Sequence, residues 1–148
     1  SLIESLAETE TLRGFNRVLE IGCGTGGFLV AAKRKYDHVV GADIAFRWLV
    51  VARKRLEELK MNVPLVCCCA EYLPFPGTRF DIILAEDVLE HVRSQESTLA
   101  ECRRVMTKQG MLFLATPNRF SLTPEPHVRV WGVGLDERLR QAREGDFL

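Results

Sequence analysis

The feature that most constrains the fold of this chain is a series of short apolar runs, each about as long as a β-strand. The runs lie at residues 17–21, 38–43, 65–69, 80–85 and 111–116. Within each run the apolar residues are nearly continuous instead of alternating with polar ones. That pattern is typical of strands that are buried on both faces, as in a parallel sheet.

Helical periodicity separates several of these runs. Apolar residues recur at spacings of three and four across residues 45–59 and again across 99–106, which predicts two amphipathic helices. Ser94 is the predicted N-cap of the second helix, and Gly110 is expected just past its end. Strands that alternate with helices predict an α/β fold, built as a doubly wound and mainly parallel sheet.

The length of 148 residues indicates one domain. We expect an N-terminal helix over residues 1–14, a ligand-binding core over 15–118, and an irregular or helical tail over 119–148. Twenty basic and twenty acidic residues give zero net charge, which argues against a nucleic-acid partner. No apolar stretch approaches the length of a membrane span, and the first residues do not resemble a signal peptide.

The five cysteines include three in succession, Cys67, Cys68 and Cys69. Neighbouring side chains of an extended segment point to opposite faces, so this run predicts neither a shared metal nor a disulfide framework. Reduced thiols in a cytoplasmic protein are the simplest interpretation.

The most informative segment is the glycine-rich stretch that follows the first apolar run. Gly22, Gly24 and Gly26 are spaced as G-x-G-x-G, and Gly27 also completes the dinucleotide pattern G-x-G-x-x-G. Glycines let a ligand approach the main chain closely, and in a doubly wound sheet this turn lies at the carboxyl ends of the strands, where ligands bind. The loop alone fits either a nicotinamide dinucleotide or another nucleoside cofactor.

Acidic residues near the expected strand ends narrow the choice of ligand. Glu20 would repel a pyrophosphate held by the glycine loop and would attract a cationic group, such as the ammonium and sulfonium groups of S-adenosylmethionine. Asp43 closes the next run, where a carboxylate accepts hydrogen bonds from both ribose hydroxyls. We expect it to face the crevice and to contribute little to folding. Glu71 is suited to contact an adenine edge.

With these residues the chain resembles the class I S-adenosylmethionine-dependent methyltransferases, in particular the small-molecule branch grouped as type 11. The resemblance covers residues from about 15 to 118. The matching blocks are residues 18–26, Asp43, residues 70–76, residues 80–83 and residues 87–92. It implies a Rossmann-like methyltransferase fold and S-adenosylmethionine as the cofactor.

The resemblance also implies which residues bind that cofactor. They are Glu20, Gly22, Cys23, Gly24, Gly26, Asp43, Ile44, Ala70, Glu71 and Glu86. Glu20 and Glu86 would lie near the methionine part, Asp43 would bind the ribose, and Ile44 would flank the adenine. Ala70 and Glu71 would lie along the adenine edge.

Methyl transfer needs a general base only if the acceptor must lose a proton. His91 and His127 are the candidate bases, because both follow runs that end at the active side of the sheet. Asp87, Glu90 and His91 resemble an arrangement that some quinone-pathway relatives use for a divalent ion, but we predict no metal site.

The chain is short for this fold, because the family's sheet ends in an antiparallel hairpin for which the last 32 residues provide too little strand. We therefore expect that hairpin to be missing, and a second copy or the tail to cover the fifth strand. The leading hypothesis is a methyltransferase acting on an unidentified small molecule. A cofactor-binding fragment or regulatory domain is the alternative, and a nicotinamide-dependent oxidoreductase is a weaker one.

Overall fold

The computed structural model describes residues 14–115 of the chain. The predicted N-terminal helix, the predicted tail and the predicted absence of a C-terminal hairpin all lie outside the described residues, and they stay predictions.

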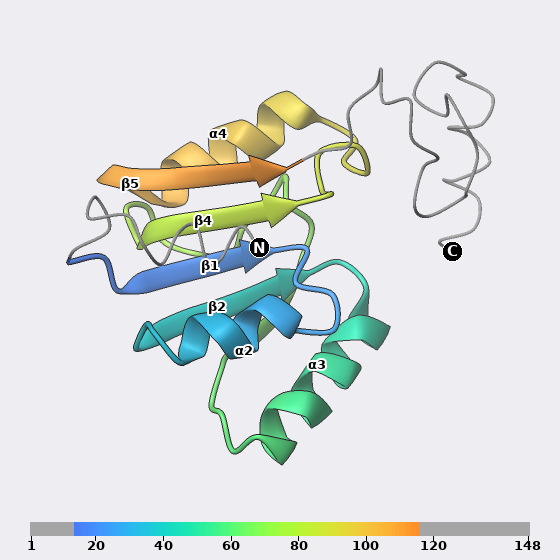
Figure 1. The fold of residues 1–148 in the computed structure, drawn as a ribbon. Helices are drawn as coiled ribbons and strands as arrows, with labels where there is room; N and C mark the ends of the chain where they lie inside the picture. Colours follow the sequence, from blue (N-terminus) through green and yellow to red (C-terminus); the bar gives the residue numbers. More distant parts are fainter. Residues whose placement is uncertain (1–13, 116–148) are drawn as a thin grey trace, which may run out of the picture. The chain divides into compact units, whose positions relative to one another are not determined.

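Within residues 14–115, five strands form one sheet in the order β3-β2-β1-β4-β5. They are β1 (Arg17–Ile21), β2 (His38–Asp43), β3 (Leu65–Cys67), β4 (Phe80–Glu86) and β5 (Met106–Ala115). β1 pairs in parallel with β2 and β4, and β2 pairs in parallel with β3. Figure 1 shows β5 running in the same direction beside β4. The predicted parallel α/β sheet is confirmed.

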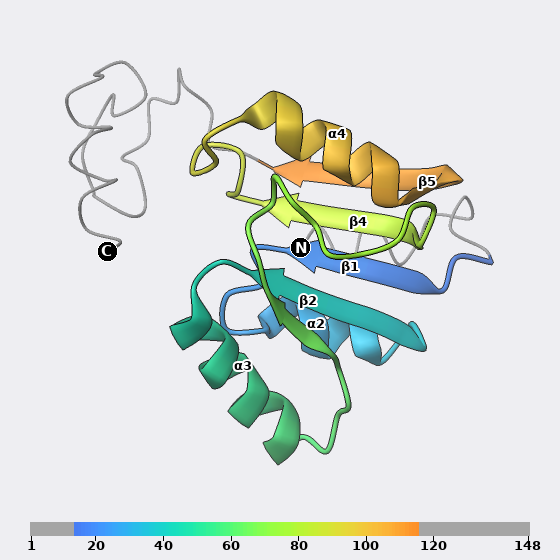
Figure 2. The ribbon, with the colours of Figure 1, turned by 180° about the vertical axis from the view of Figure 1, so that it is seen from behind.

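Helices cover both faces of this sheet, as a doubly wound fold requires. α2 (Gly27–Lys33) and α3 (Phe46–Glu58) lie on one face, and α4 (Gln95–Val105) lies on the other. The view from behind in Figure 2 brings α4 in front of the sheet. None of the helices within residues 14–115 has the length and apolar content needed to cross a bilayer.

The alternation of side chains along β1 sends its residues into two separate cores. Val18 packs with Leu29 of α2 and Leu56 of α3, and all three are fully buried. Leu19, one residue later, lies in the opposite core with Cys102 of α4. This explains why the apolar run is continuous, since both faces of the central strand are covered.

The end of α4 differs from the sequence prediction. The Ser94 side chain accepts a hydrogen bond from Ser97 N at 3.1 Å, so the predicted N-cap is confirmed. The helix ends at Val105, however, and β5 begins at once with Met106. Gly110 is therefore a strand residue and not the end of the helix. A side chain there would clash, because a Cβ would lie 2.4 Å from Met106 Cγ.

The buried faces of the helices are also narrower than the apolar spacing predicts. Leu49, Ala52 and Leu56 of α3 are buried, but Trp48 is 40% exposed. In α4 a polar residue outside the apolar spacing, Thr98, is fully buried, and its hydroxyl donates a hydrogen bond to the Ser94 carbonyl.

At the amino-terminal edge of the sheet, Asp81 joins β4 to β1. Its carboxylate accepts hydrogen bonds from the backbone N–H groups of Asn16 and Arg17 and from the Arg17 guanidinium. Burial alone would raise the pKa of Asp81, but these hydrogen bonds outweigh it, and the pKa is lowered from 3.8.

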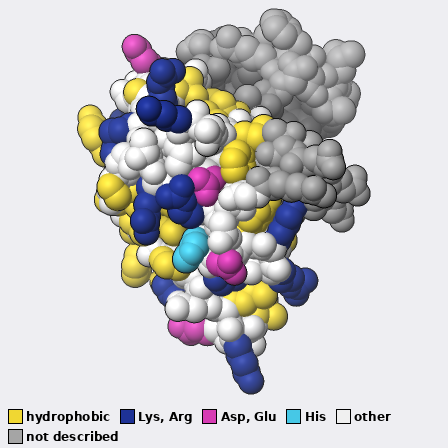
Figure 3. All heavy atoms as spheres, turned by 90° about the vertical axis from the view of Figure 1, so that its left-hand side faces the viewer, with side chains coloured by type: hydrophobic (Ala, Val, Ile, Leu, Met, Phe, Trp, Pro, Cys, Tyr) yellow, Lys and Arg dark blue, Asp and Glu magenta, His cyan; other side chains and the backbone are white. Residues whose placement is uncertain are grey.

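On the side seen in Figure 3, basic side chains are interspersed with acidic and apolar ones.

Candidate functional site

Three carboxylates meet at the carboxyl-terminal edge of the sheet, on its central strands. In the parallel register Ile21 pairs with Ala42 of β2 and with Ala85 of β4. Asp43 and Glu86, the next residues of those strands, therefore flank the point where β1 passes into the glycine loop. Glu20 lies just before that point on β1, and because side chains alternate along a strand, it shares a face of the sheet with them.

The glycine loop has left-handed backbone angles at the three predicted glycines. Gly22, Gly24 and Gly26 have φ values of 74°, 49° and 76°, a region that residues with a Cβ seldom adopt. At Gly22 there is also no space for a side chain, because a Cβ would lie 2.5 Å from Val88 Cγ2. At Gly24 a Cβ would meet nothing within 4 Å, so the loop presents bare backbone to open space there.

Asp43 has a structural role that the sequence did not reveal. Its Oδ2 accepts a hydrogen bond from Gly24 N at 2.8 Å, and its Oδ1 accepts one from Ala45 N at 2.7 Å. The residue is only 9% exposed. These two bonds argue against the expectation that Asp43 contributes little to folding. Each carboxylate oxygen has two lone pairs, so acceptor capacity remains for ribose hydroxyls.

Cys23 makes its contacts within the protein. Its side chain lies in the core beside Leu29, its N–H donates to the Ala42 carbonyl, and its carbonyl accepts from Gly26 N. Burial and the nearby carboxylates raise the pKa of its thiol to about 12. The structure thus assigns Cys23 to building the loop, and its contacts do not support the predicted contact with a cofactor.

Glu20 has the most perturbed environment of the site. The residue is 8% exposed, and its Oε2 is buried with no hydrogen-bond partner among residues 14–115. Burial raises the pKa of Glu20 to about 9, and the negative charges of Glu86 and Asp43 add to this effect. An unpartnered buried carboxyl group between two other carboxylates provides a place for a positively charged group.

The remaining predicted cofactor residues lie at or after the carboxyl ends of β2, β3 and β4. Ile44 follows Asp43 and is 72% exposed, so its side chain is available to pack against a flat ligand. Ala70 is buried after β3, and Glu86 is exposed at the end of β4. The Glu71 carboxylate accepts a hydrogen bond from Arg93 N at 2.8 Å, which holds two loops of this edge together.

Of the two candidate bases, His91 lies within the described residues. His91 is exposed on the loop after β4, where its backbone N–H donates to the Val88 carbonyl. His127 lies outside the described residues. Within residues 14–115, no group of three His, Cys, Asp or Glu side chains is placed to hold a metal ion.

Two residues important to this geometry are not among the predicted site residues. Val88 packs against Gly22, and Arg93 uses only its backbone N–H to hold Glu71. Both contacts join segments far apart in the chain, so only the folded structure reveals them.

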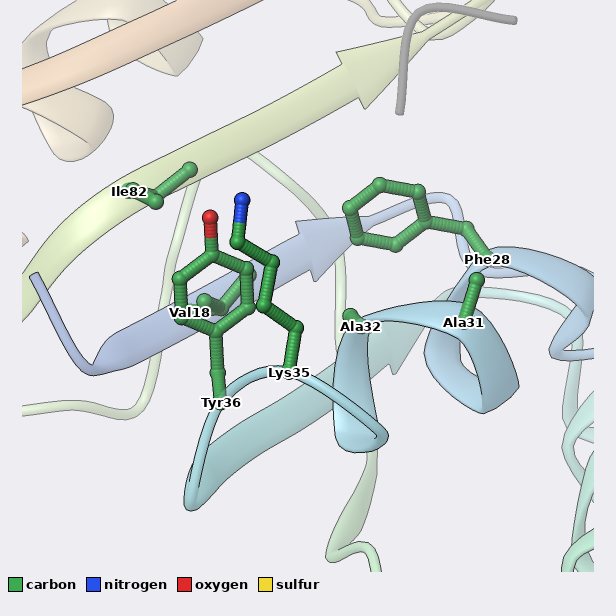
Figure 4. Close-up of a pocket in the computed structure, with 7 residues that line it drawn as sticks. All are labelled: Val18, Phe28, Ala31, Ala32, Lys35, Tyr36 and Ile82. Atoms are coloured by element: carbon green, nitrogen blue, oxygen red, sulfur yellow. The ribbon is translucent and has the colours of Figure 1, made fainter. Parts of the chain in front are cut away.

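A separate small hollow lies on the face of the sheet that α2 covers (Figure 4). Val18, Phe28, Ala31, Ala32, Lys35, Tyr36 and Ile82 line it. Its lining is almost wholly apolar, and the Tyr36 hydroxyl is buried there with no hydrogen-bond partner among the described residues. None of the three site carboxylates lines it, so it is distinct from the glycine-loop site.

Comparison with known proteins identifies the family of the chain. Residues 19–114 match the model of a family described as a methyltransferase domain. A ubiquinone biosynthesis O-methyltransferase from Roseobacter denitrificans is 37% identical over 140 residues, which are 95% of this chain and 54% of that protein. The chain spans about half the length of the curated relatives it matches.

Solved structures show the same fold. YcgJ from Bacillus subtilis is 28% identical with a TM-score of 0.70, over 86% of this chain and 51% of that one. The methyltransferase CalH, solved as a complex with SAH, is 26% identical with a TM-score of 0.61, over 76% of this chain and 34% of that one. With the family model covering most of the described sheet, the chain belongs to the methyltransferase-domain family, the type 11 branch of the class I S-adenosylmethionine-dependent methyltransferases.

Proposed function

We propose that this chain binds S-adenosylmethionine and serves a methyl transfer to a small-molecule acceptor. The observation that carries the proposal is Glu20, a nearly buried carboxyl group that lies beside Asp43 and Glu86. Its Oε2 has no hydrogen-bond partner in the part of the chain that the structure describes. Such a site favours a cationic ligand and disfavours the pyrophosphate of a nicotinamide dinucleotide. Membership of the methyltransferase-domain family argues in the same direction.

The residues of the site fit the parts of this cofactor. Glu20 and Glu86 offer negative charge to its methionine part, and Asp43 offers acceptors to the ribose. The bare backbone at Gly24 permits close approach, and the exposed Ile44 offers an apolar surface to the adenine. When bound, S-adenosylmethionine supplies an activated methyl group on a sulfonium.

The protein's own contribution is then chiefly to hold and align. Asp43 fixes the glycine loop through Gly24, and the loop and strand ends orient the ligand relative to the acceptor. Alignment of this kind accounts for a large part of the rate in a displacement reaction. His91, exposed on the loop after β4, is the described residue that we propose to accept a proton from a hydroxyl acceptor.

We propose that the acceptor is a small hydroxylated molecule, since the curated relatives are named as O-methyltransferases. Zero net charge favours such an acceptor over a nucleic acid.

All five cysteines of the chain lie within the described residues and are free thiols, which fits the cytoplasmic location expected from the sequence. Pairing of β5 with a second copy stays a prediction.

Ligand-induced stabilisation tests the cofactor assignment. A ligand that binds only the folded state at a hundred times its Kd stabilises it by about 2.7 kcal/mol. We expect S-adenosylmethionine and S-adenosylhomocysteine to raise the melting temperature, with NAD as the comparison ligand. A larger rise with NAD at equal concentration would overturn the assignment.

The alternative of a cofactor-binding fragment is distinguished by turnover. A radiolabelled methyl-transfer assay with phenols, amines and thiols would be run on the same preparation. Binding with no transfer to any acceptor would favour the fragment, whereas transfer to a phenol would support the proposed O-methylation.

A further inference from the structure

We propose that Glu20 carries a proton in the ligand-free protein and releases it to solvent when a cationic ligand group docks against it. Binding of the cofactor would then be coupled to the release of a proton and would strengthen as the pH rises. This inference rests on the proposed function, because it takes S-adenosylmethionine as the cationic ligand.

The geometry around Glu20 is the first argument. The residue lies on the central strand β1, enclosed by β2 on one side and β4 on the other. It is 8% exposed, and no hydrogen bond within the described residues reaches its Oε2. A buried carboxylate without a partner is costly, and the neutral acid avoids that cost.

The charges that face Glu20 are the second argument. β2 contributes Asp43 and β4 contributes Glu86, and the negative charges of both raise the pKa of Glu20, in addition to the larger effect of burial. The glycine loop contributes the thiol of Cys23. These neighbours bring no positive charge to the carboxyl group.

The basic residue of α3 that reaches the glycine loop does not change this. Arg55 of α3 reaches the loop, where its guanidinium approaches the Thr25 hydroxyl at 3.4 Å instead of a site carboxylate. Asp43, for its part, is already bonded to the N–H groups of Gly24 and Ala45. Of the two buried carboxyl groups of the site, Glu20 is thus the one with no internal donor at Oε2 among residues 14–115.

A docked cation reverses this balance. A positive group near Oε2 stabilises the carboxylate, so the pKa of Glu20, about 9 in the free protein, falls on binding. The proton passes to the buffer, and no other reactant is needed. By linkage, one proton released per ligand means that the Kd falls about tenfold for each unit by which the pH rises, between the pKa of Glu20 in the complex and its pKa of about 9 in the free protein.

The experiment is calorimetry of S-adenosylmethionine binding to the 148-residue chain, in buffers of different ionisation enthalpy, from pH 6 to pH 8. The matched control is Glu20→Gln, which keeps the shape and cannot ionise. The ligand's own α-ammonium also titrates near this range, with a pKa of about 8, and its contribution is common to both proteins. We expect the wild type to release about one proton more than the variant at pH 7.

Equal proton release and equal pH dependence in the two proteins would overturn the proposal. Infrared spectra of the ligand-free protein provide a second readout, independent of any ligand. A protonated carboxyl band at pH 7 that is absent in Glu20→Gln supports the proposal, and its absence from the wild type contradicts it. If the wild type binds neither S-adenosylmethionine nor S-adenosylhomocysteine at any pH, the proposed function fails, and the infrared band still decides the ionisation of Glu20.

A second variant covers the case in which Glu20→Gln does not fold. Glu86→Gln removes one of the charges that raise the pKa of Glu20, so the infrared titration of the carboxyl band should move to lower pH. An unchanged titration would show that the band does not come from this cluster and would overturn the proposal.

Discussion

The backbone N–H of Gly24 donates a 2.8 Å hydrogen bond to Oδ2 of Asp43 and so joins the glycine loop to the carboxyl end of β2. The same carboxylate accepts from Ala45 N, the residue before α3. Asp43 therefore fixes three elements at the position where a ribose would bind. Ligand recognition and local folding depend on one side chain here.

We expect Asp43→Ala to weaken both properties. Loss of two accepted hydrogen bonds leaves the N–H groups of Gly24 and Ala45 without this partner, at a cost of about 1–3 kcal/mol in the free energy of unfolding. The Kd for S-adenosylhomocysteine should rise at least tenfold, as measured by calorimetry. Glu57→Ala, an exposed change in α3, is the control and should alter neither quantity. A fully stable Asp43→Ala protein would contradict the structural role.

Gly22 is expected to be the least replaceable glycine of the loop. In Gly22→Ala the new Cβ would lie 2.5 Å from Val88 Cγ2, and the alanine would have to adopt a φ of +74°. We therefore expect the free energy of unfolding, measured in urea, to fall by at least about 2 kcal/mol. Adding Val88→Ala should restore part of this loss by removing the clash. If the two changes are simply additive, the contact between these residues is not responsible.

Gly24→Ala should behave differently from Gly22→Ala. The φ of +49° predicts a cost of about 1 kcal/mol, but the Cβ enters open space and clashes with nothing within 4 Å. Because that space faces the proposed ligand, the affinity for S-adenosylhomocysteine should fall more than the stability does. Normal affinity in Gly24→Ala would place the ligand away from this part of the loop.

The sheet was predictable from the sequence because burial on both faces leaves continuous apolar runs. Residues 17–21 and 38–43 are strands with the bounds that their apolar pattern predicts. The start of β5 was not predictable in this way. Thr107, Lys108 and Gln109 are polar and precede a glycine, which resembles a turn, yet they extend the strand next to β4.

The candidate site was predictable in its residue types but not in its contacts. The positions of Glu20 and Asp43 follow from their places at strand ends. That Asp43 would bond to Gly24, or Glu71 to Arg93 N, depends on loops that meet only in the folded chain. Local sequence patterns carry no information on such pairings.

At the opposite edge of the sheet, Asp81→Asn should destabilise the protein by about 1–3 kcal/mol at pH 7, because it weakens charge-assisted bonds from Arg17 and from two backbone N–H groups. The folded-state pKa of Asp81 is below 3.8, so its contribution is present above that pH and is lost as the pH falls through the folded-state value. The difference between wild type and variant should therefore shrink in acid.

Urea unfolding at pH 7 and at pH 3 measures this difference. Asp37→Asn is the matched control, because Asp37 is exposed at the same edge and accepts a side-chain bond from Asn16. It should change stability by less than about 0.5 kcal/mol. A difference for Asp81→Asn that is constant with pH would show that the loss is not electrostatic.

Glu20 should impose the opposite pH dependence on stability. Its pKa is raised from 4.5 to about 9 in the folded protein, so between these values the folded chain retains a proton that the unfolded chain has lost. The contribution of Glu20 is thus fully present below pH 4.5 and decreases as the pH rises toward 9. Glu20→Gln lacks this titration, and its stability relative to the wild type should increase steadily from pH 5 to pH 9 in urea unfolding without ligand. A constant difference between the two proteins over that range would mean that Glu20 is already ionised in the folded chain at pH 5, and that burial and the charges of Asp43 and Glu86 do not hold its proton.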